Sequence, residues 1–271
     1  MPTQREAGSF TFDQQAGSFD RRAGLPAAAA QRAAEAVCEL AGVDGLVIDI
    51  GAGTGEVGSQ LARGPCRYLG IDISLPMLRA FRHKLGTAEA GLLRADAGRP
   101  WPVAVGCASV IFSSRAAHLI DSAHLVAETL RVARPEAATL VIGRVQRPAD
   151  SVRVELRREM RRLLARSGVE GRGGRRAGER LMRALEAAGG QRLPAQRVAS
   201  WEVTERPADA LRAWRDKPGL AGRAVSPTLK NDILRRLEAW SQKRLGELTL
   251  PRRTAEYYEL LAVRLSRQRG D

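Results

Sequence analysis

The chain has 271 residues, 44% of them hydrophobic, which supports one large α/β domain with insertions and a substantial hydrophobic core. No apolar run approaches the length of a signal core or a membrane span, so we expect a soluble, cytoplasmic protein without membrane contact. The formal charge of +14 rests on 44 basic residues, of which only four are lysine; such a composition does not by itself identify a polyanionic partner.

The cysteines Cys38, Cys66 and Cys107 are widely spaced and form no Cys-x-x-Cys pair. This spacing suggests neither a disulfide framework nor a zinc site. We therefore expect reduced, buried thiols and no bound metal.

In chain order, the first predicted element is an alanine-rich helix over residues 25–40, which has apolar residues at helical spacing. A buried strand over residues 46–50 follows and leads directly into Gly51, Gly53 and Gly55. Closely spaced glycines between a strand and a helix let backbone N–H groups approach an anionic ligand. Asp72 ends the next strand, 21 positions after Gly51, where a carboxylate can hold a ribose diol. Together these features predict a nucleotide-type cofactor site, whereas the alternative is a tight glycine turn without a ligand.

The register of the glycines distinguishes between cofactors. A dinucleotide fingerprint can be aligned on Gly53, Gly55 and Gly58, but it begins two residues too late after the strand. Reading from Gly51 instead places the carboxylate of Asp49 inside the strand end. A fixed negative charge there repels a diphosphate and suits a cofactor that carries an amino group.

Further strands are predicted over residues 67–72, 91–95, 107–113 and 138–144, with helices between them, as in a parallel sheet of βαβ units. After residue 148 the pattern changes to helices over residues 151–167, 176–188, 207–216 and 227–245, with strands six and seven at 197–204 and 257–265. We expect four parts: a helical cap (1–45), a cofactor-binding core (46–146), a helical lid (147–195), and the remaining core with a helical insertion (196–271).

Several motifs resemble those of class I S-adenosylmethionine (SAM) methyltransferases. Asp49-x-Gly51-x-Gly53-x-Gly55 resembles their motif I, residues 72–78 resemble the Asp-x-Ser-x-x-Met-Leu step after strand two, and Asp96-Ala97 resembles the adenine-binding pair after strand three. Residues 130–142 resemble the entry to strand five. The resemblance implies a Rossmann-like, doubly wound sheet of seven strands, mostly parallel with the last antiparallel, plus helical lid insertions. It also implies SAM as cofactor.

The same resemblance implies which residues bind the cofactor. Residues 18–23 resemble an aromatic-Asp-x-x-Ala helix that precedes motif I and folds over the cofactor; the alternative is a frayed tail. The implied cofactor-binding residues are Asp49, Gly51, Ala52, Gly53, Asp72, Ile73, Met77, Asp96, Ala97, Ser113 and Phe19.

Acceptor-side residues are expected after strand four, in residues 112–119. His118 is the candidate general base because its side chain titrates near neutral pH, although a histidine bonded to the backbone is the alternative. Arg115 is the candidate substrate anchor, or it pairs with an acid such as Asp121. Methyltransferases of exocyclic base amines resemble one another in an Asn/Asp-Pro-Pro-aromatic motif here, whereas this chain has Ser113-Ser114-Arg115-Ala116.

The leading hypothesis is a SAM-dependent methyltransferase that transfers a methyl group by in-line displacement to oxygen, nitrogen or carbon of a small molecule. One alternative directs it to RNA or a substrate on an acidic carrier protein, through the basic stretch from Arg153 to Arg183. That stretch is otherwise a solvated helix face with Glu/Arg pairs. A further alternative is a non-catalytic SAM-binding scaffold.

Overall fold

The computed structural model describes residues 24–169 and 174–265, and these form two compact units. Unit 1 comprises the described residues up to 144, residues 175–199 and those from 258 onward. Unit 2 comprises residues 145–174 and 200–257, as far as they are described. The sequence grouped residues 147–195 as one lid, whereas the structure assigns the two helices of that range to different units.

A mixed sheet has the strand order β3-β2-β1-β4-β5-β10-β6, and β7 also pairs with β10. Strands β1 to β5 pair in parallel, and β10 pairs antiparallel with β6. The predicted Rossmann-like sheet, mostly parallel with a last antiparallel strand, is confirmed; the short β6 brings it to eight strands rather than seven. The bounds are β1 Leu46–Ile50, β2 Arg67–Asp72, β3 Gly91–Arg94, β4 Val110–Ser114, β5 Ala138–Gln146, β6 Gln191–Arg192, β7 Gln196–Glu205 and β10 Arg252–Leu265.

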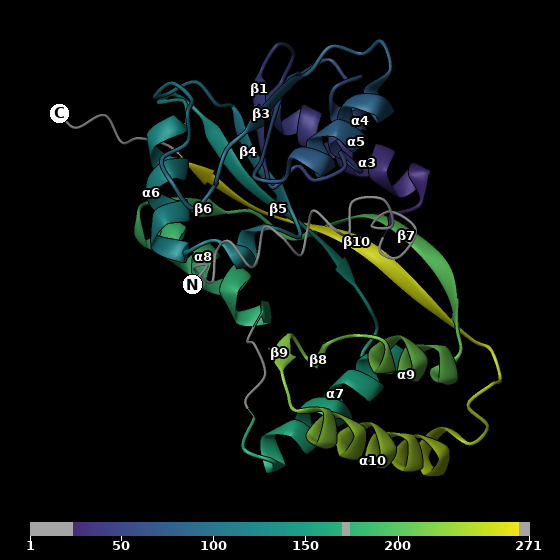
Figure 1. The fold of residues 1–271 in the computed structure, drawn as a ribbon. Helices are drawn as coiled ribbons and strands as arrows, with labels where there is room; N and C mark the ends of the chain where they lie inside the picture. The colour runs from purple at the N-terminus through teal and green to yellow at the C-terminus, as the bar shows by residue number, and fades with distance from the viewer. Residues whose placement is uncertain (1–23, 170–173, 266–271) are drawn as a thin grey trace. The chain divides into compact units, whose positions relative to one another are not determined.

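Helices cover both faces of this sheet (Figure 1). α3 (Ala27–Ala41), α4 (Gly58–Leu61) and α5 (Leu75–Leu85) lie on one side, and α6 (Ser122–Val132) and α8 (Gly174–Ala187) lie on the other. Each long helix directs one apolar stripe to the sheet, as the spacing of apolar residues in the sequence predicts.

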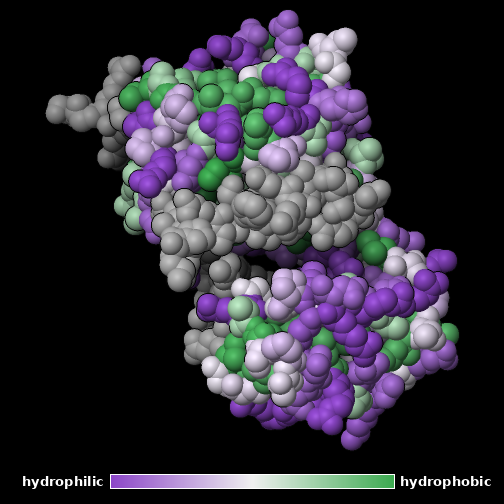
Figure 2. All heavy atoms as spheres, in the orientation of Figure 1, coloured by the Kyte–Doolittle hydropathy of each residue, from purple (hydrophilic) through white to green (hydrophobic). Residues whose placement is uncertain are grey.

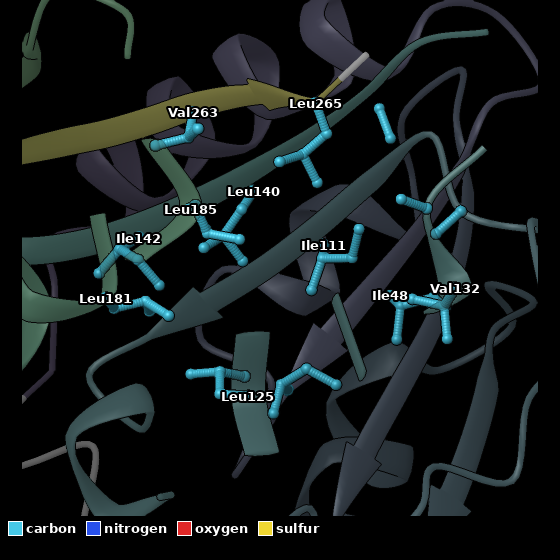
Figure 3. Packing of buried hydrophobic residues seen from close by; sticks show 14 of the residues in the cluster. Ile48, Ile111, Leu125, Val132, Leu140, Ile142, Leu181, Leu185, Val263 and Leu265 are labelled. Carbon is cyan, nitrogen blue, oxygen red and sulfur yellow. The ribbon is translucent and has the colours of Figure 1, made fainter. Parts of the chain in front are cut away.

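The core between the sheet and helices α6 and α8 arises from the two-residue period of the strands. Alternate residues of β1, β4, β5 and β10 direct apolar side chains to this face, and they meet apolar residues of the two helices (Figure 3). Each such side chain stabilises the fold by roughly 1.5–3 kcal/mol when fully buried. The labelled members are Ile48, Ile111, Leu125, Val132, Leu140, Ile142, Leu181, Leu185, Val263 and Leu265.

Gly143 of β5 lies directly under Tyr258 of β10, and a Cβ at this glycine would lie 1.9 Å from the Tyr258 hydroxyl oxygen. We expect Gly143→Ala to lower the free energy of unfolding by about 1–3 kcal/mol, because the fully buried ring has no space to retreat. Gly178 of α8 is the matched control, since nothing lies within 4 Å of its Cβ position. Gly178→Ala should raise stability by about 0.5–1 kcal/mol. Urea unfolding measures both changes in the free energy of unfolding. Equal effects of the two substitutions would contradict the close packing of Gly143 against Tyr258.

Unit 2 has a hydrophobic core of its own, formed by α7 (Val152–Arg166), α9 (Pro207–Arg215) and α10 (Pro227–Leu245), with the hairpin β8 (Gly219–Leu220) and β9 (Arg223–Ala224). Its largest contributors include Leu156, Leu211, Trp214, Ile233 and Leu237. On the face drawn in Figure 2, hydrophilic residues dominate the surface over α9 and α10. The apolar residues of α8 belong instead to the sheet core of unit 1.

The expectation that all cysteines are thiols is wrong. Cys38, in the last turns of α3, forms a disulfide with Cys66, just before β2, and their Cα atoms are 5.6 Å apart. Cys107 is free and half-buried. The spacing of 28 residues carries no local signal for this pairing, because only the return of the chain from α4 to β2 brings the two residues together.

The basic stretch from Arg153 to Arg183 is divided between the two units. It spans α7 of unit 2 and α8 of unit 1, and several of its arginines pair with carboxylates inside their own unit. The pairs are Arg153–Glu205, Arg162–Glu159 and Arg183–Glu179. In the described part of the chain, no helix has the length and apolar character needed to cross a bilayer.

Candidate functional site

The loop after β1 depends on glycine at three positions. Gly51, Gly53 and Gly55 have φ angles of +73°, +57° and +71°, which L side chains rarely adopt. Space is also excluded, because a Cβ at Gly51 would lie 2.2 Å from the Cβ of Ala116, and one at Gly55 would lie 2.1 Å from the ring of Phe81. The glycines therefore let the backbone turn sharply off the strand at the carboxyl edge of the sheet.

Asp72 at the end of β2 connects this loop to the neighbouring strand. One carboxylate oxygen accepts the backbone N–H of Gly53 at 2.8 Å, and the other accepts the N–H of Ser74 at 2.8 Å. Ser74 in turn caps α5 by accepting the N–H of Met77. The structure thus brings together the glycine loop and the acidic residue that the sequence placed 21 positions apart.

Asp49 lies buried within β1, and one of its oxygens accepts a hydrogen bond of 2.8 Å from the hydroxyl of Tyr68. Its other oxygen, Oδ1, is buried without a hydrogen-bond partner among the residues that the structure describes. Burial raises the pKa of Asp49 to about 7; the Tyr68 hydrogen bond opposes this shift, and the charge of Asp72 adds to it. A buried carboxylate oxygen without a donor fits a ligand that carries an amino group.

Four further predicted cofactor residues lie along the same sheet edge, after β2 and β3. Asp96 follows β3 and accepts the N–H of Gly98 at 2.8 Å, next to the half-buried Ala97. Met77 is buried on α5, and Ile73 is half-buried after Asp72. Since β3, β2, β1 and β4 are neighbours in the sheet, their carboxyl ends meet at one edge.

Ser113 differs from this group. The hydroxyl of Ser113 is buried and donates to the carbonyl oxygen of Ile50 at 2.8 Å, so it joins the ends of β4 and β1. Its side chain is therefore already engaged within the sheet. Phe19 lies outside the described residues.

Arg115 follows β4 in a left-handed conformation, with φ of +66°. Its guanidinium pairs with Glu56 of the glycine loop, and not with Asp121, which instead caps α6. Glu56 also accepts the N–H of Leu25, so this carboxylate connects the segment before α3 with the end of β4. His118 is exposed on a short 3₁₀ turn, Ala117–Leu119, a few residues farther along.

Two residues of this edge were not predicted from the sequence: Glu56 and Tyr258. The hydroxyl groups of Ser114 and Tyr258 are 2.6 Å apart, although 144 positions separate them in the chain. Burial holds the pKa of Tyr258 well above its usual range, so this phenol stays neutral near pH 7. No local motif marks Tyr258, because only the pairing of the late strand β10 in the sheet brings it to the end of β4.

A sequence profile of the methyltransferase domain family matches residues 47–136, which run from β1 through the turn before β5. Over these residues the chain is similar to a methyltransferase domain. The match covers the glycine loop and the ends of β1 to β4, so the resemblance of the motifs within this range is confirmed. No curated protein matches the sequence.

Solved structures similar to this chain agree on the fold. A candidate methyltransferase from Bacillus halodurans has a TM-score of 0.55 at 16% identity, over 86% of this chain and 98% of its own. A candidate type II methyltransferase from Anaeromyxobacter dehalogenans has a TM-score of 0.53 at 21% identity, over 86% of this chain and 94% of its own. Phosphoethanolamine N-methyltransferase 2 of Haemonchus contortus was solved in complex with phosphomonomethylethanolamine and S-adenosylhomocysteine. It has a TM-score of 0.53 at 14% identity, over 99% of this chain and 61% of its own.

Proposed function

We propose that this methyltransferase binds SAM at the carboxyl edge of β1 to β4 and transfers its methyl group to a small-molecule acceptor. The backbone of residues 51–53 and the carboxylate of Asp49 would hold the amino-acid part of the cofactor. Asp72 would hold the ribose, and Asp96 with Ala97 and Met77 would hold the adenine. When bound, SAM supplies an electrophilic methyl group whose transfer leaves a neutral thioether.

The observation that carries this proposal is the 2.8 Å hydrogen bond from the Gly53 N–H to Asp72, together with the unpartnered oxygen of Asp49. The carboxylates of Asp49 and Asp72 flank one glycine loop. That of Asp49 is buried, and its Oδ1 has no hydrogen-bond donor among the described residues. A cationic amino group satisfies that acceptor, whereas a diphosphate meets repulsion from both acids. The residues present therefore fit SAM better than a dinucleotide.

On the acceptor side, we propose that His118 takes a proton from the acceptor and that Arg115 orients an anionic acceptor group. His118 is exposed and follows the end of β4 closely, and Arg115 is already held at that end by Glu56. The Haemonchus neighbour supports a small acceptor, since it was solved with one. In-line transfer requires alignment and exclusion of water rather than a nucleophile from the protein.

Calorimetric titration with SAM and S-adenosylhomocysteine tests the cofactor assignment, and we expect micromolar dissociation constants for both. Incubation of the protein with methyl-labelled SAM and a fractionated cell extract tests the acceptor class. The label should appear in the low-molecular-weight fraction. Absence of heat with either cofactor form would refute the site, and label confined to RNA or protein would refute the small-molecule acceptor.

A further inference from the structure

Unit 2 contains a cavity of about 230 Å³ that is separate from the edge of the sheet described above. Arg157, Met160 and Arg161 of α7 line it, together with Trp214 of α9, Lys217 and the β8–β9 turn. All of these residues belong to the same unit. A volume of this size holds a small ligand or one end of a larger ligand.

Arg157 and Arg161 place two positive charges on one side of the cavity. Arg157 and Arg161 lie four residues apart on α7 and therefore share a face of the helix. Arg153, one turn earlier, forms an ion pair with Glu205 at 2.9 Å, and Arg147 forms one with Glu256 at 2.5 Å. Within residues 24–169 and 174–265, no carboxylate oxygen lies within 4.0 Å of the guanidinium of Arg157 or Arg161.

The other arginines in the middle of α7 contrast with this pair. Arg158 donates to the carbonyl oxygen of Ala149, and Arg162 pairs with Glu159. Burial, as the largest cause, and the charges of Arg147, Arg153 and Arg161 together lower the pKa of Arg157 to about 10, while the charge of Glu205 opposes this shift. Like charges gathered around a largely desolvated guanidinium are unfavourable unless an anion joins them.

One wall of the cavity is apolar. Trp214 and Met160 are 8% and 3% exposed and line the cavity beside the two guanidinium groups. An indole ring and a thioether offer a surface for an aromatic or aliphatic group, and guanidinium planes also stack on aromatic rings. The cavity thus joins an anion-binding side to an apolar side.

We infer that this cavity binds a small molecule in which a phosphate monoester is attached to an aromatic or other apolar group. Two adjacent guanidinium groups match a dianion in charge, and each presents paired N–H donors to phosphate oxygens. A carboxylate carries one negative charge and would leave one guanidinium uncompensated. The inference goes beyond the proposed methyl transfer and does not depend on it.

Calorimetric titrations into the 271-residue protein at pH 8 and low salt test the inference. The four compounds titrated are phenyl phosphate, benzoate, phenol and inorganic phosphate. At this pH the phosphate monoester is a dianion. We expect phenyl phosphate to bind at least tenfold more tightly than benzoate or inorganic phosphate, and phenol to give no heat. No binding of phenyl phosphate, or benzoate or inorganic phosphate binding equally well, would overturn the inference.

Arg157→Gln and Arg161→Gln should each weaken phenyl phosphate binding at least tenfold. Arg166→Gln, which removes the same charge from an exposed position at the end of α7, should change it less than twofold. Arg161 is exposed as well, so its substitution does not threaten folding, and the melting temperature of each variant checks this. Equal binding by Arg161→Gln and the wild type would refute the site. Titration with SAM reports separately on unit 1, so failure of one proposal does not imply failure of the other.

Discussion

Replacing Asp72 with alanine is expected to weaken SAM binding at least a hundredfold. The substitution removes the proposed ribose acceptor, and it also leaves the N–H groups of Gly53 and Ser74 without the carboxylate that holds them. The loop then loses the geometry on which the rest of the site depends. We expect a loss of about 1–3 kcal/mol in the free energy of unfolding, because two backbone donors lose their acceptor.

Calorimetry with SAM, together with urea unfolding, measures both effects of Asp72→Ala. Asp72→Asn keeps one acceptor oxygen and should fall between the wild type and the alanine variant. Asp209→Ala is the control, since it removes an exposed carboxylate that pairs with Arg212 in unit 2. A dissociation constant for Asp72→Ala within twofold of the wild type would show that Asp72 neither binds the cofactor nor is needed to hold the loop for it.

Asp49 should make SAM binding depend on pH. Its pKa of about 7 means that the carboxyl group is largely protonated at pH 6 and largely ionised at pH 8. Only the ionised form attracts the amino group of SAM, so affinity should fall as the pH is lowered through 7, by up to about tenfold per unit. Asp49→Asn should bind SAM more weakly at pH 7.5 and should show a flat profile between pH 5.5 and 7.5.

The same group should affect stability with a defined sign. An aspartate in the unfolded chain has a pKa of about 3.9, so between pH 4 and 7 the folded protein holds a proton that the unfolded chain has released. Stability contributed by the protonated form is therefore present at low pH and is lost as the pH rises to about 7, by roughly 4 kcal/mol at most. Asp49→Asn should gain stability relative to the wild type over this window. If the difference in free energy of unfolding between Asp49→Asn and the wild type stayed constant from pH 5 to 8, this would contradict the raised pKa of Asp49.

The fold could largely be predicted from the sequence because its signals are local. β1, β2 and the helices α3, α7, α9 and α10 lie close to their predicted ranges, since each carries an apolar pattern of the right period. β4 begins at Val110 rather than at residue 107, because the chain first makes a single bridge at Ala108. The last strand begins earlier than predicted, at Arg252.

The cofactor side of the site was also predictable, for a related reason. A glycine that must adopt positive φ cannot be replaced without strain, so Gly51, Gly53 and Gly55 mark the turn directly in the sequence. The acceptor side was predicted less well. Arg115 pairs with Glu56 and not with Asp121, because the glycine loop lies beside the end of β4 and Asp121 is occupied in capping α6.

The sequence by itself determined the glycine turn, the acids that end the strands and the order of strands and helices, because these depend on neighbouring residues and on the period of the apolar pattern. The tertiary structure alone decided the Cys38–Cys66 disulfide, the Ser114–Tyr258 contact and the arginine-lined cavity of unit 2. Each of these joins residues that lie far apart in the chain or on different elements, and no local pattern records which distant side chain will face which. Packing of the finished strands and helices supplies that information.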